Sequence, residues 1–428
     1  MLVSAHQNLG TDLDMSGSGA PPRNWRGIGL AMLVISIVMS LVLLSIFLLS
    51  PENSKVPEKF PLTLSDLENV ENQLLLPQIS WASDSEIILE TKDGNLIRQN
   101  LETKKSSLLL NNVTFLSLQM SDHKLSPDLQ NLLLVSKSQK VAGVSFTASY
   151  SLYNIRSRDL WSLTPPGKNE SVLQYAGWGC QGSQLAFIFN NDIYYQESAS
   201  SPALRLTSSG DPDNIRNGIT DWTYQEEVLH RYAAHWWSPD GARLAYLSIN
   251  TTLVPKMELP QFVGADYPTS TRYAYPKAGQ PIPVVKVFVV NLHGPSHTVE
   301  ILRPDTFEYR EYYVTLVSWV TDTGLVVQWL NRSQNLSVLT ICDAITGTCV
   351  EKHRASSDVW ISTQANIVAS TDSIFMLVPV KQGAQRENVH IAMLSIQSGS
   401  KDSFLRMLTS GDWDVTRIVA YSADNKTV

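Results

Sequence analysis

The pattern of apolar and polar positions divides the chain into one long apolar run near the N-terminus and a long region of short apolar runs. Residues 27–50 form the long run, which holds no charged side chain. As a helix, its 24 residues rise roughly 36 Å, enough to cross a hydrocarbon layer of about 30 Å. A cleaved signal peptide has a shorter apolar region followed by a small-residue cleavage site. This run is longer, and no such site follows it. The pattern therefore predicts an uncleaved transmembrane signal anchor.

The charges and glycosylation motifs around this run predict its orientation. Arg23 and Arg26 lie just before it, whereas Lys55 and Lys59 lie farther out among acidic residues. The positive-inside rule therefore places the N-terminus in the cytosol. Six N-x-Ser/Thr triplets all follow the run, which fits a C-terminal region glycosylated on the outer side of the plasma membrane. These triplets begin at Asn112, Asn169, Asn250, Asn331, Asn335 and Asn425.

From residue 76 onward, short apolar runs alternate with polar turns, and one module recurs. It consists of an aromatic or apolar residue, a Ser-Pro-Asp-like turn and an apolar strand. The clearest copies are Trp237–Gly241 before 244–247 and Leu125–Asp128 before 132–135. Copies recur about every 44–60 residues, apart from one interval of about 80 that holds an insertion, and such spacing is typical of β-propeller blades. A set of β-sandwiches is the alternative fold.

These patterns predict an all-β protein with an N-terminal transmembrane helix. We expect a cytosolic tail (1–26), a signal anchor (27–50), a stalk (51–75) and an extracellular propeller (76–428). The tail is rich in Gly, Ser and Pro. The stalk carries prolines and a capping box at Ser65, which predicts a short helix.

Composition and charge exclude some classes of function. Hydrophobic residues make up 43% of the chain and charged residues 17%, a balance that supports a folded core. The net charge is −7 and the basic residues are not clustered, so nucleic-acid binding is not expected. The eight histidines begin no metal-binding pattern, and we expect no metal or other cofactor.

The three cysteines have different expected roles. Cys342 and Cys349 flank a segment with a Thr-Gly turn between two strand-like runs, so their sulfurs could meet across a hairpin. In an oxidising compartment a disulfide is the expected outcome, and two reduced core thiols are the alternative. Cys180 is then left over and is expected to be a small buried apolar residue.

The long apolar run also carries small residues four positions apart. Gly27 and Ala31 form one such pair, and Ser36 and Ser40 form another. Small side chains at this spacing let a second helix approach closely. The alternative is that Gly, Ala and Ser are simply common in membrane helices.

Several segments carry a specific resemblance to a known family. Asp221–Val228, His235–Gly241 and Tyr275–Gly279 resemble the dipeptidyl peptidase IV family in order, spacing and aromatic content. Asn24–Gly27 and Val380–Gly383 are similar to its non-catalytic branch, which modulates voltage-gated potassium channels. The fold that this resemblance implies is an eight-bladed propeller followed by an α/β-hydrolase domain. Because the chain ends about six blades in, we expect an incomplete propeller, as a truncated product or a fragment.

The resemblance also bears on chemistry. A serine hydrolase of this type needs a G-x-S-x-G nucleophile motif, and the sequence holds none, so we expect no enzyme activity. Glu226 and Glu227 match the paired glutamates that hold the substrate amine in active relatives, and their charge suits a cationic amine. The alternative, which we favour, is a solvated acidic turn or an ion pair within the propeller. An arginine of active relatives is replaced here by Gly143.

Three functions compete. The resemblance implies an auxiliary membrane subunit whose helix packs on a voltage-gated (Kv4-type) potassium channel and which modulates channel trafficking and gating. The second candidate is the N-terminal part of a membrane serine exopeptidase that removes dipeptides. The third is a general extracellular adhesion module, since propellers bind many kinds of partner. A dimer with itself or with other family members is a further expectation from the resemblance.

Overall fold

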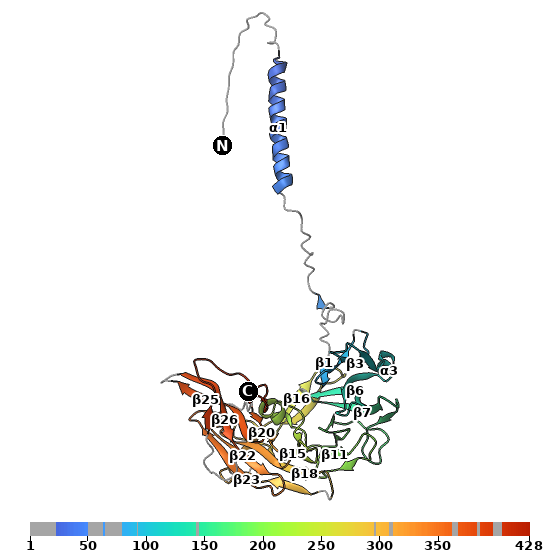
Figure 1. Ribbon diagram of the computed structural model, residues 1–428, viewed down its shortest axis with the longest axis vertical. Coiled ribbons are helices and arrows are strands. Elements are labelled where there is room, and N and C mark those ends of the chain that lie inside the picture. Colours follow the sequence, from blue (N-terminus) through green and yellow to red (C-terminus); the bar gives the residue numbers. More distant parts are fainter. Residues whose placement is uncertain are drawn as a thin grey trace, which may run out of the picture. The chain divides into compact units, whose positions relative to one another are not determined.

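The chain forms two units in the computed structural model, Met1–Leu76 and Pro77–Val428 (Figure 1). The structure describes residues 23–49, 63–64, 79–91, 93–142, 145–294, 297–307, 311–361, 367–382, 386–396 and 405–428. Most of the predicted tail lies outside these residues, as does most of the predicted stalk with its short helix.

Helix α1 (Trp25–Leu49) is the main element of the first unit. Asn24 closes its first turn, because its side-chain Oδ1 accepts a hydrogen bond from Gly27 N at 3.1 Å and its carbonyl accepts one from Ile28 N at 3.0 Å. Asparagine is a favoured residue in this capping role. The helix therefore begins two residues before the predicted start at Gly27. Its length and apolar composition are sufficient to cross a membrane.

The second unit contains six antiparallel sheets of four or five strands among the residues that the structure describes. The first sheet contains β1 (Ile79–Ser83), β2 (Glu86–Glu90), β3 (Leu96–Asn100) and β4 (Ser106–Leu110). A short helix that the sequence did not predict, α3 (Asn112–Ser117), follows it. The second sheet contains β5 (Met120–Leu125), β6 (Asn131–Ala142), β7 (Ser145–Asn154) and β8 (Leu160–Ser162). The third contains β9 (Tyr175–Trp178), β10 (Leu185–Phe189), β11 (Asp192–Gln196) and β12 (Leu204–Arg205).

The fourth sheet differs from the others because it carries two additional elements. It contains β13 (Ile215–Asn217), β14 (His235–Trp237), β15 (Arg243–Asn250), β18 (Val284–Asn291) and β19 (Thr298–Ile301). A helical turn, η2 (Tyr224–Val228), precedes β14, and a hairpin of β16 (Lys256–Gln261) and β17 (Thr269–Ala274) is inserted before β18. This hairpin accounts for the long interval in the repeat.

The fifth and sixth sheets return to the four-stranded pattern. The fifth contains β20 (Tyr312–Trp319), β21 (Gly324–Asn331), β22 (Leu336–Asp343) and β23 (Cys349–Ser356). The sixth contains β24 (Ile367–Ala369), β25 (Ser373–Gln382), β26 (Arg386–Ser395) and β27 (Leu405–Met407).

Central strands of these sheets are buried on both faces. On β15, Ala245 and Leu247 belong to a hydrophobic cluster with the fifth sheet, whereas Leu244 and Tyr246 belong to one with the third sheet. Alternate side chains of a strand point to opposite faces, so one strand serves two interfaces. Both faces must then be apolar, and this explains why the sequence shows short continuous apolar runs.

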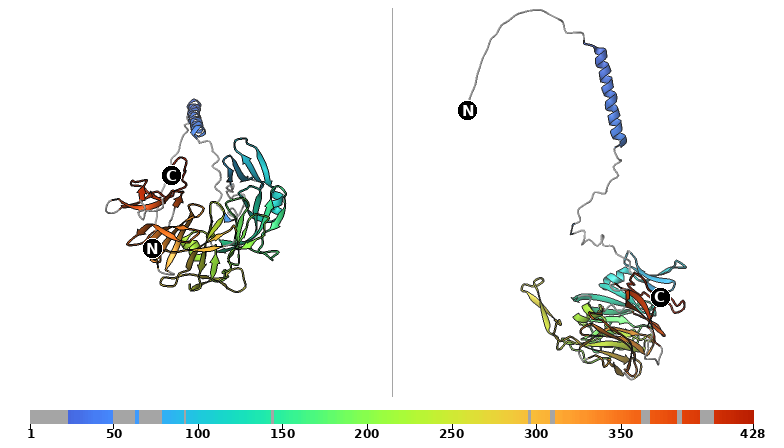
Figure 2. Two further views of the ribbon diagram at one scale, coloured as in Figure 1. Left: turned by 60° about the horizontal axis from the view of Figure 1, so that its bottom comes forward. Right: turned by 90° about the vertical axis from the view of Figure 1, so that its left-hand side faces the viewer.

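Five hydrophobic clusters join the six sheets in chain order. In the left view of Figure 2 the sheets follow one another round an arc, from cyan to red. Within the described part of the chain, no such cluster joins the sixth sheet to the first. This arrangement is that of a β-propeller that is not closed. The predicted incomplete propeller is therefore confirmed, and the sandwich alternative is excluded.

The Ser-Pro-Asp turns that mark the repeat have the same hydrogen bonds in different sheets. In the fourth sheet, Ser238 Oγ donates to the Asp240 carboxylate and accepts from Arg243 N at 2.9 Å. Ser126 and Asp128 form the equivalent bonds in the second sheet. Each turn thus fixes the start of the strand that follows it.

The cysteines follow the prediction in one case and contradict it in the other. Cys342 and Cys349 are opposite each other on β22 and β23 and are joined by a disulfide. The connecting turn needs Gly347, which has a φ of +76° and whose Cβ, if present, would overlap the carbonyl oxygen of Glu300. Cys180 is an exposed free thiol, so the prediction that it is buried is wrong. It lies in the turn after β9 rather than in a strand, and its Sγ is 3.1 Å from the carbonyl oxygen of Ser238.

Candidate functional site

The two candidate glutamates lie on a helical turn that buried side chains hold in place. Asp221 closes the start of η2, because its carboxylate accepts hydrogen bonds from Tyr224 N at 3.1 Å and Thr223 N at 3.4 Å. Burial raises the pKa of Asp221. Tyr224 is fully buried, and its hydroxyl accepts a hydrogen bond from Val314 N of β20 at 3.2 Å. The turn is therefore fixed to the fifth sheet as well as the fourth.

Glu226 and Glu227 are adjacent and exposed on this turn. The Glu226 carboxylate accepts a hydrogen bond from Gln225 Nε2 at 3.0 Å. Neither glutamate forms an ion pair with any residue that the structure describes. Trp222, which precedes η2, packs its ring against that of Tyr275, with centroids 5.0 Å apart. The arrangement agrees with a solvated acidic turn, and binding of a substrate amine stays a prediction.

Two further expectations from the sequence concern an arginine position and metal binding. Gly143, which stands where active relatives carry an arginine, lies outside them. No group of three or more His, Cys, Asp and Glu side chains in the described part of the chain is placed to hold a metal ion.

The small residues of α1 lie on two opposite faces. Successive residues of a helix are rotated by about 100°, so Ser36, nine residues after Gly27, lies on the opposite side. Gly27 and Ala31 therefore mark one face, and Ser36 and Ser40 mark the other, on which Gly29 also lies. No side chain in the membrane-crossing stretch of α1 is buried within the described structure. Each face therefore carries side chains small enough for another helix to approach closely.

The six glycosylation triplets differ in their surroundings. Asn169 and Asn425 are exposed, whereas the other four asparagines are half-buried. Asn331 holds the hairpin between β21 and β22, because its Oδ1 accepts hydrogen bonds from Asn335 N and Leu336 N at 3.0 Å. Its Nδ2 donates to Asn335 Oδ1 at 2.8 Å. Glycosylation of these six asparagines stays a prediction.

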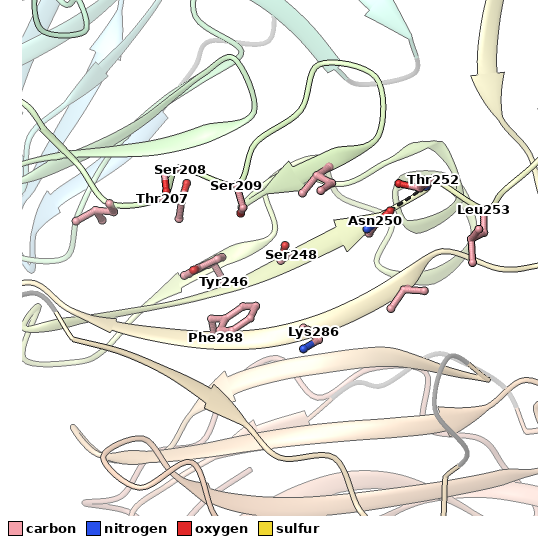
Figure 3. Close-up of a pocket in the computed structure, with 13 residues that line it drawn as sticks. Thr207, Ser208, Ser209, Tyr246, Ser248, Asn250, Thr252, Leu253, Lys286 and Phe288 are labelled. Carbon is pink, nitrogen blue, oxygen red and sulfur yellow. Dashed lines mark hydrogen bonds between the residues drawn. The ribbon is translucent and has the colours of Figure 1, made fainter.

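A groove that the sequence did not predict lies beside β15 and β18 of the fourth sheet (Figure 3). Its volume is about 630 Å³. The chain leaves the third sheet after the two residues of β12 and continues as the non-strand segment Leu206–Ser209, which lines the opposite wall. The walls come from segments about 40 residues apart in the sequence, so no local pattern could have indicated the groove.

The fold and these sites define an incomplete β-propeller that follows an N-terminal apolar helix. Residues 126–428 match the family described as the dipeptidyl peptidase IV N-terminal region. The chain belongs to the dipeptidyl peptidase IV family, as its sequence motifs indicated.

Individual relatives refine this assignment. The chain is 49% identical over 416 residues to inactive dipeptidyl peptidase 10 of Rattus norvegicus, covering 96% of the chain and 52% of that protein. It is 35% identical over 322 residues to prolyl endopeptidase FAP of Mus musculus, covering 73% of the chain and 40% of that protein. The chain thus spans about half the length of the curated relatives that it matches over most of its own length.

A solved structure shows the same fold. The crystal structure of Porphyromonas gingivalis dipeptidyl peptidase 4 superposes with a TM-score of 0.70 and covers 85% of this chain and 51% of that one. Their sequences are 19% identical, so this likeness concerns the fold alone.

Proposed function

We propose that the chain is a non-catalytic type II glycoprotein of the plasma membrane that acts as an auxiliary subunit of a voltage-gated (Kv4-type) potassium channel. Helix α1 is the contact with the channel, and the propeller lies outside the cell. The proposal is carried by the similarity to relatives named inactive. Inactive dipeptidyl peptidase 10 of Mus musculus is 48% identical over 99% of the chain, which includes α1.

The two faces of α1 support a helix contact. Association of helices in lipid depends on close packing of small residues and on hydrogen bonds between helices. Ser36 and Ser40 supply both, because their side chains are small and carry hydroxyls that lipid cannot satisfy. Gly27 and Ala31 offer a second closely packing face on the opposite side.

Substitutions on separate faces test this contact. The double substitution Ser36→Leu and Ser40→Leu adds bulk to one face of α1, and Ala31→Leu adds bulk to the opposite face. As a control, Ile35→Phe with Met39→Phe adds bulk to the surface between the two faces. Since a helix contact contributes about 1–2 kcal/mol, the change on the contact face should weaken co-purification with the channel about tenfold. Gly27 is left unchanged because a Cβ there would lie 3.2 Å from the capping Asn24 Nδ2. Undiminished co-purification of both face variants would show that α1 is not the contact.

The second candidate is the N-terminal part of a membrane exopeptidase. It is favoured by the exposed Glu226 and Glu227 pair and by 30% identity over 92% of the chain to dipeptidyl peptidase 4 of Bos taurus. Residues 1–428 hold no G-x-S-x-G motif, so a cleavage assay distinguishes the two functions only when the chain is expressed together with any region encoded downstream. With a dipeptide-linked chromogenic substrate, the auxiliary-subunit proposal expects no cleavage by that protein, whereas cleavage that Glu226→Ala abolishes would establish the exopeptidase. The coding sequence downstream gives an independent answer, because an exopeptidase requires G-x-S-x-G there.

A further inference from the structure

The groove beside β15 and β18 has a fixed wall. Asp192 is almost fully buried, and its carboxylate accepts hydrogen bonds from Thr207 Oγ1 at 2.6 Å and Gly210 N at 2.9 Å. It also accepts one from Asn217 Nδ2 at 3.1 Å, which ties the segment to β13. Because this carboxylate holds both ends of the Thr207–Gly210 segment, the groove is formed before any ligand enters it.

One end of the groove is a glycosylation triplet. Asn250 is the last residue of β15 and lines the groove together with Thr252, the third residue of the same triplet. Its Oδ1 accepts a hydrogen bond from Thr252 N at 2.8 Å, drawn as the dashed line in Figure 3. Its Nδ2, the atom that would bear a glycan, donates no hydrogen bond to any described residue. This leaves the nitrogen available at the groove, unlike that of Asn331, which is engaged with Asn335.

The floor of the groove continues from Asn250 along the strand. Tyr246, Ser248 and Asn250 alternate on β15 and therefore share one face of the sheet. On β18, Phe288 lies opposite Tyr246, and Lys286 lies opposite Ser248. At about 3.3 Å per residue, Ser248 lies roughly 7 Å from Asn250 and Tyr246 roughly 13 Å from it, so a sugar chain on Asn250 meets Ser248 first.

The chemistry of the lining suits a short sugar chain. Ser208 and Ser248 offer hydroxyls that can bond sugar hydroxyl and acetamido groups, whereas the Ser209 hydroxyl accepts a hydrogen bond from Asn217 Nδ2 at 3.0 Å. Phe288 is half-buried and stacked on Tyr246 with ring centroids 5.5 Å apart, so it presents an apolar face for the carbon side of a sugar ring. An aromatic wall with a few placed polar groups is the usual composition of a small-ligand site.

We propose that Asn250 carries an N-linked glycan whose first two N-acetylglucosamine residues lie in this groove against Ser248 and Phe288. Transfer from a lipid diphosphate donor forms the Nδ2–C1 bond, breaks the C1–O bond to the diphosphate and releases one Nδ2 proton. The Asn250 Oδ1 bond to Thr252 N is left intact. The inference rests on the luminal orientation proposed above and not on the channel role, so failure of channel binding leaves it untouched.

The test compares glycan removal at different asparagines of the full chain, expressed in cultured mammalian cells. Membranes are treated with peptide-N-glycosidase F under native conditions, and mass spectrometry follows release at each site. Because the enzyme must reach the first sugar, release at Asn250 should be about tenfold slower than at the exposed Asn425, and equal to it after denaturation. An unglycosylated Asn250, or equal native rates at the two sites, would overturn the proposal.

Two variants test the groove itself. Phe288→Leu removes the aromatic face, and Ser248→Arg fills the floor, while both keep the triplet at Asn250. Each should raise native release at Asn250 toward the rate at Asn425. The half-buried Asn112 in α3 reports on general loosening of the fold and should be unaffected. Unchanged slow release at Asn250 in both variants would show that the groove does not hold the glycan.

Discussion

Single backbone positions decide how closely the Ser-Pro-Asp turns approach the neighbouring sheet. Gly241 ends the turn of the fourth sheet with a φ of +67°, where an L-residue is strained. The equivalent position in the second sheet is Leu129, with a φ of +59°. A Cβ at Gly241 would lie 2.5 Å from Gln184 Nε2, next to the third sheet. Glycine at Gly241 therefore avoids backbone strain, and a larger residue there would require the end of the Gln184 side chain to shift.

Replacing Gly241 by alanine should lower the free energy of unfolding by about 1–2 kcal/mol, because both the positive φ and the contact with Gln184 are unfavourable. Gly279→Ala is the matched control, since Gly279 has a φ of +76° but no atom within 4 Å of its Cβ position. Urea unfolding of the full chain in detergent, followed by tryptophan fluorescence, measures both. Equal losses in the two variants would contradict a role for the Gln184 contact.

The buried histidine of the fourth sheet should make stability depend on pH. Burial lowers the pKa of His235 to about 4, although its Nδ1–H donates to the Gly218 carbonyl at 2.8 Å. In the unfolded chain the pKa is near its usual 6.5, so the unfolded state binds more protons between pH 4 and 6.5. Stability therefore falls as the pH decreases through this window, by about 2 kcal/mol between pH 7 and pH 5.

His235→Gln separates this effect from other titrating groups. Glutamine keeps a neutral donor for the Gly218 carbonyl and cannot take up a proton. Urea unfolding at pH 7 and pH 5 should show a smaller loss of stability for the variant than for the unchanged chain. The same loss in both proteins would assign the pH dependence to other residues.

At the scale of elements, the sequence predicted what depends on local pattern. The apolar run predicted α1, and the Ser-Pro-Asp copies predicted the strands that follow them, including β6 and β15. The start of α1 was missed because the Asn24 cap depends on side-chain geometry. The groove at Asn250 and the exposure of Cys180 were missed because both depend on how segments distant in the sequence pack. For Glu226, the motif predicted the position of the side chain but not the buried contacts of Asp221 and Tyr224 that hold its turn.

The hairpin of β22 and β23 should depend on its disulfide. Replacing Cys342 and Cys349 together by alanine should cost about 2 kcal/mol, because the bond closes a short loop and restricts the unfolded chain. Alanine avoids placing a hydroxyl at Cys342, which is fully buried. Cys180→Ala, at an exposed free thiol, is the control and should change the unfolding free energy little. Thermal unfolding without reductant compares the variants, and similar midpoints for all three would contradict the prediction.

At the scale of the molecule, exposed tryptophans lie in the first sheet and just after the sixth sheet. Trp81 of the first sheet is 67% exposed, and Trp413, after the sixth sheet, is 51% exposed. The interior sheets bury both faces, as β15 shows, whereas an end sheet has one neighbour only. Uncovered apolar surface of this kind favours association with another chain or segment. The family membership, the apolar helix and the two faces of α1 support the auxiliary role at a membrane channel that we propose above.

The most direct test of the proposed channel role is an electrical recording. The current of a voltage-gated (Kv4-type) potassium channel is measured with and without co-expression of this chain. We expect a larger surface current and altered inactivation with the unchanged chain. One of the two α1 face variants should lose these effects, while the Ile35→Phe and Met39→Phe control should keep them. Current amplitude and inactivation identical to those of the channel alone, with the chain present at the cell surface, would contradict the account.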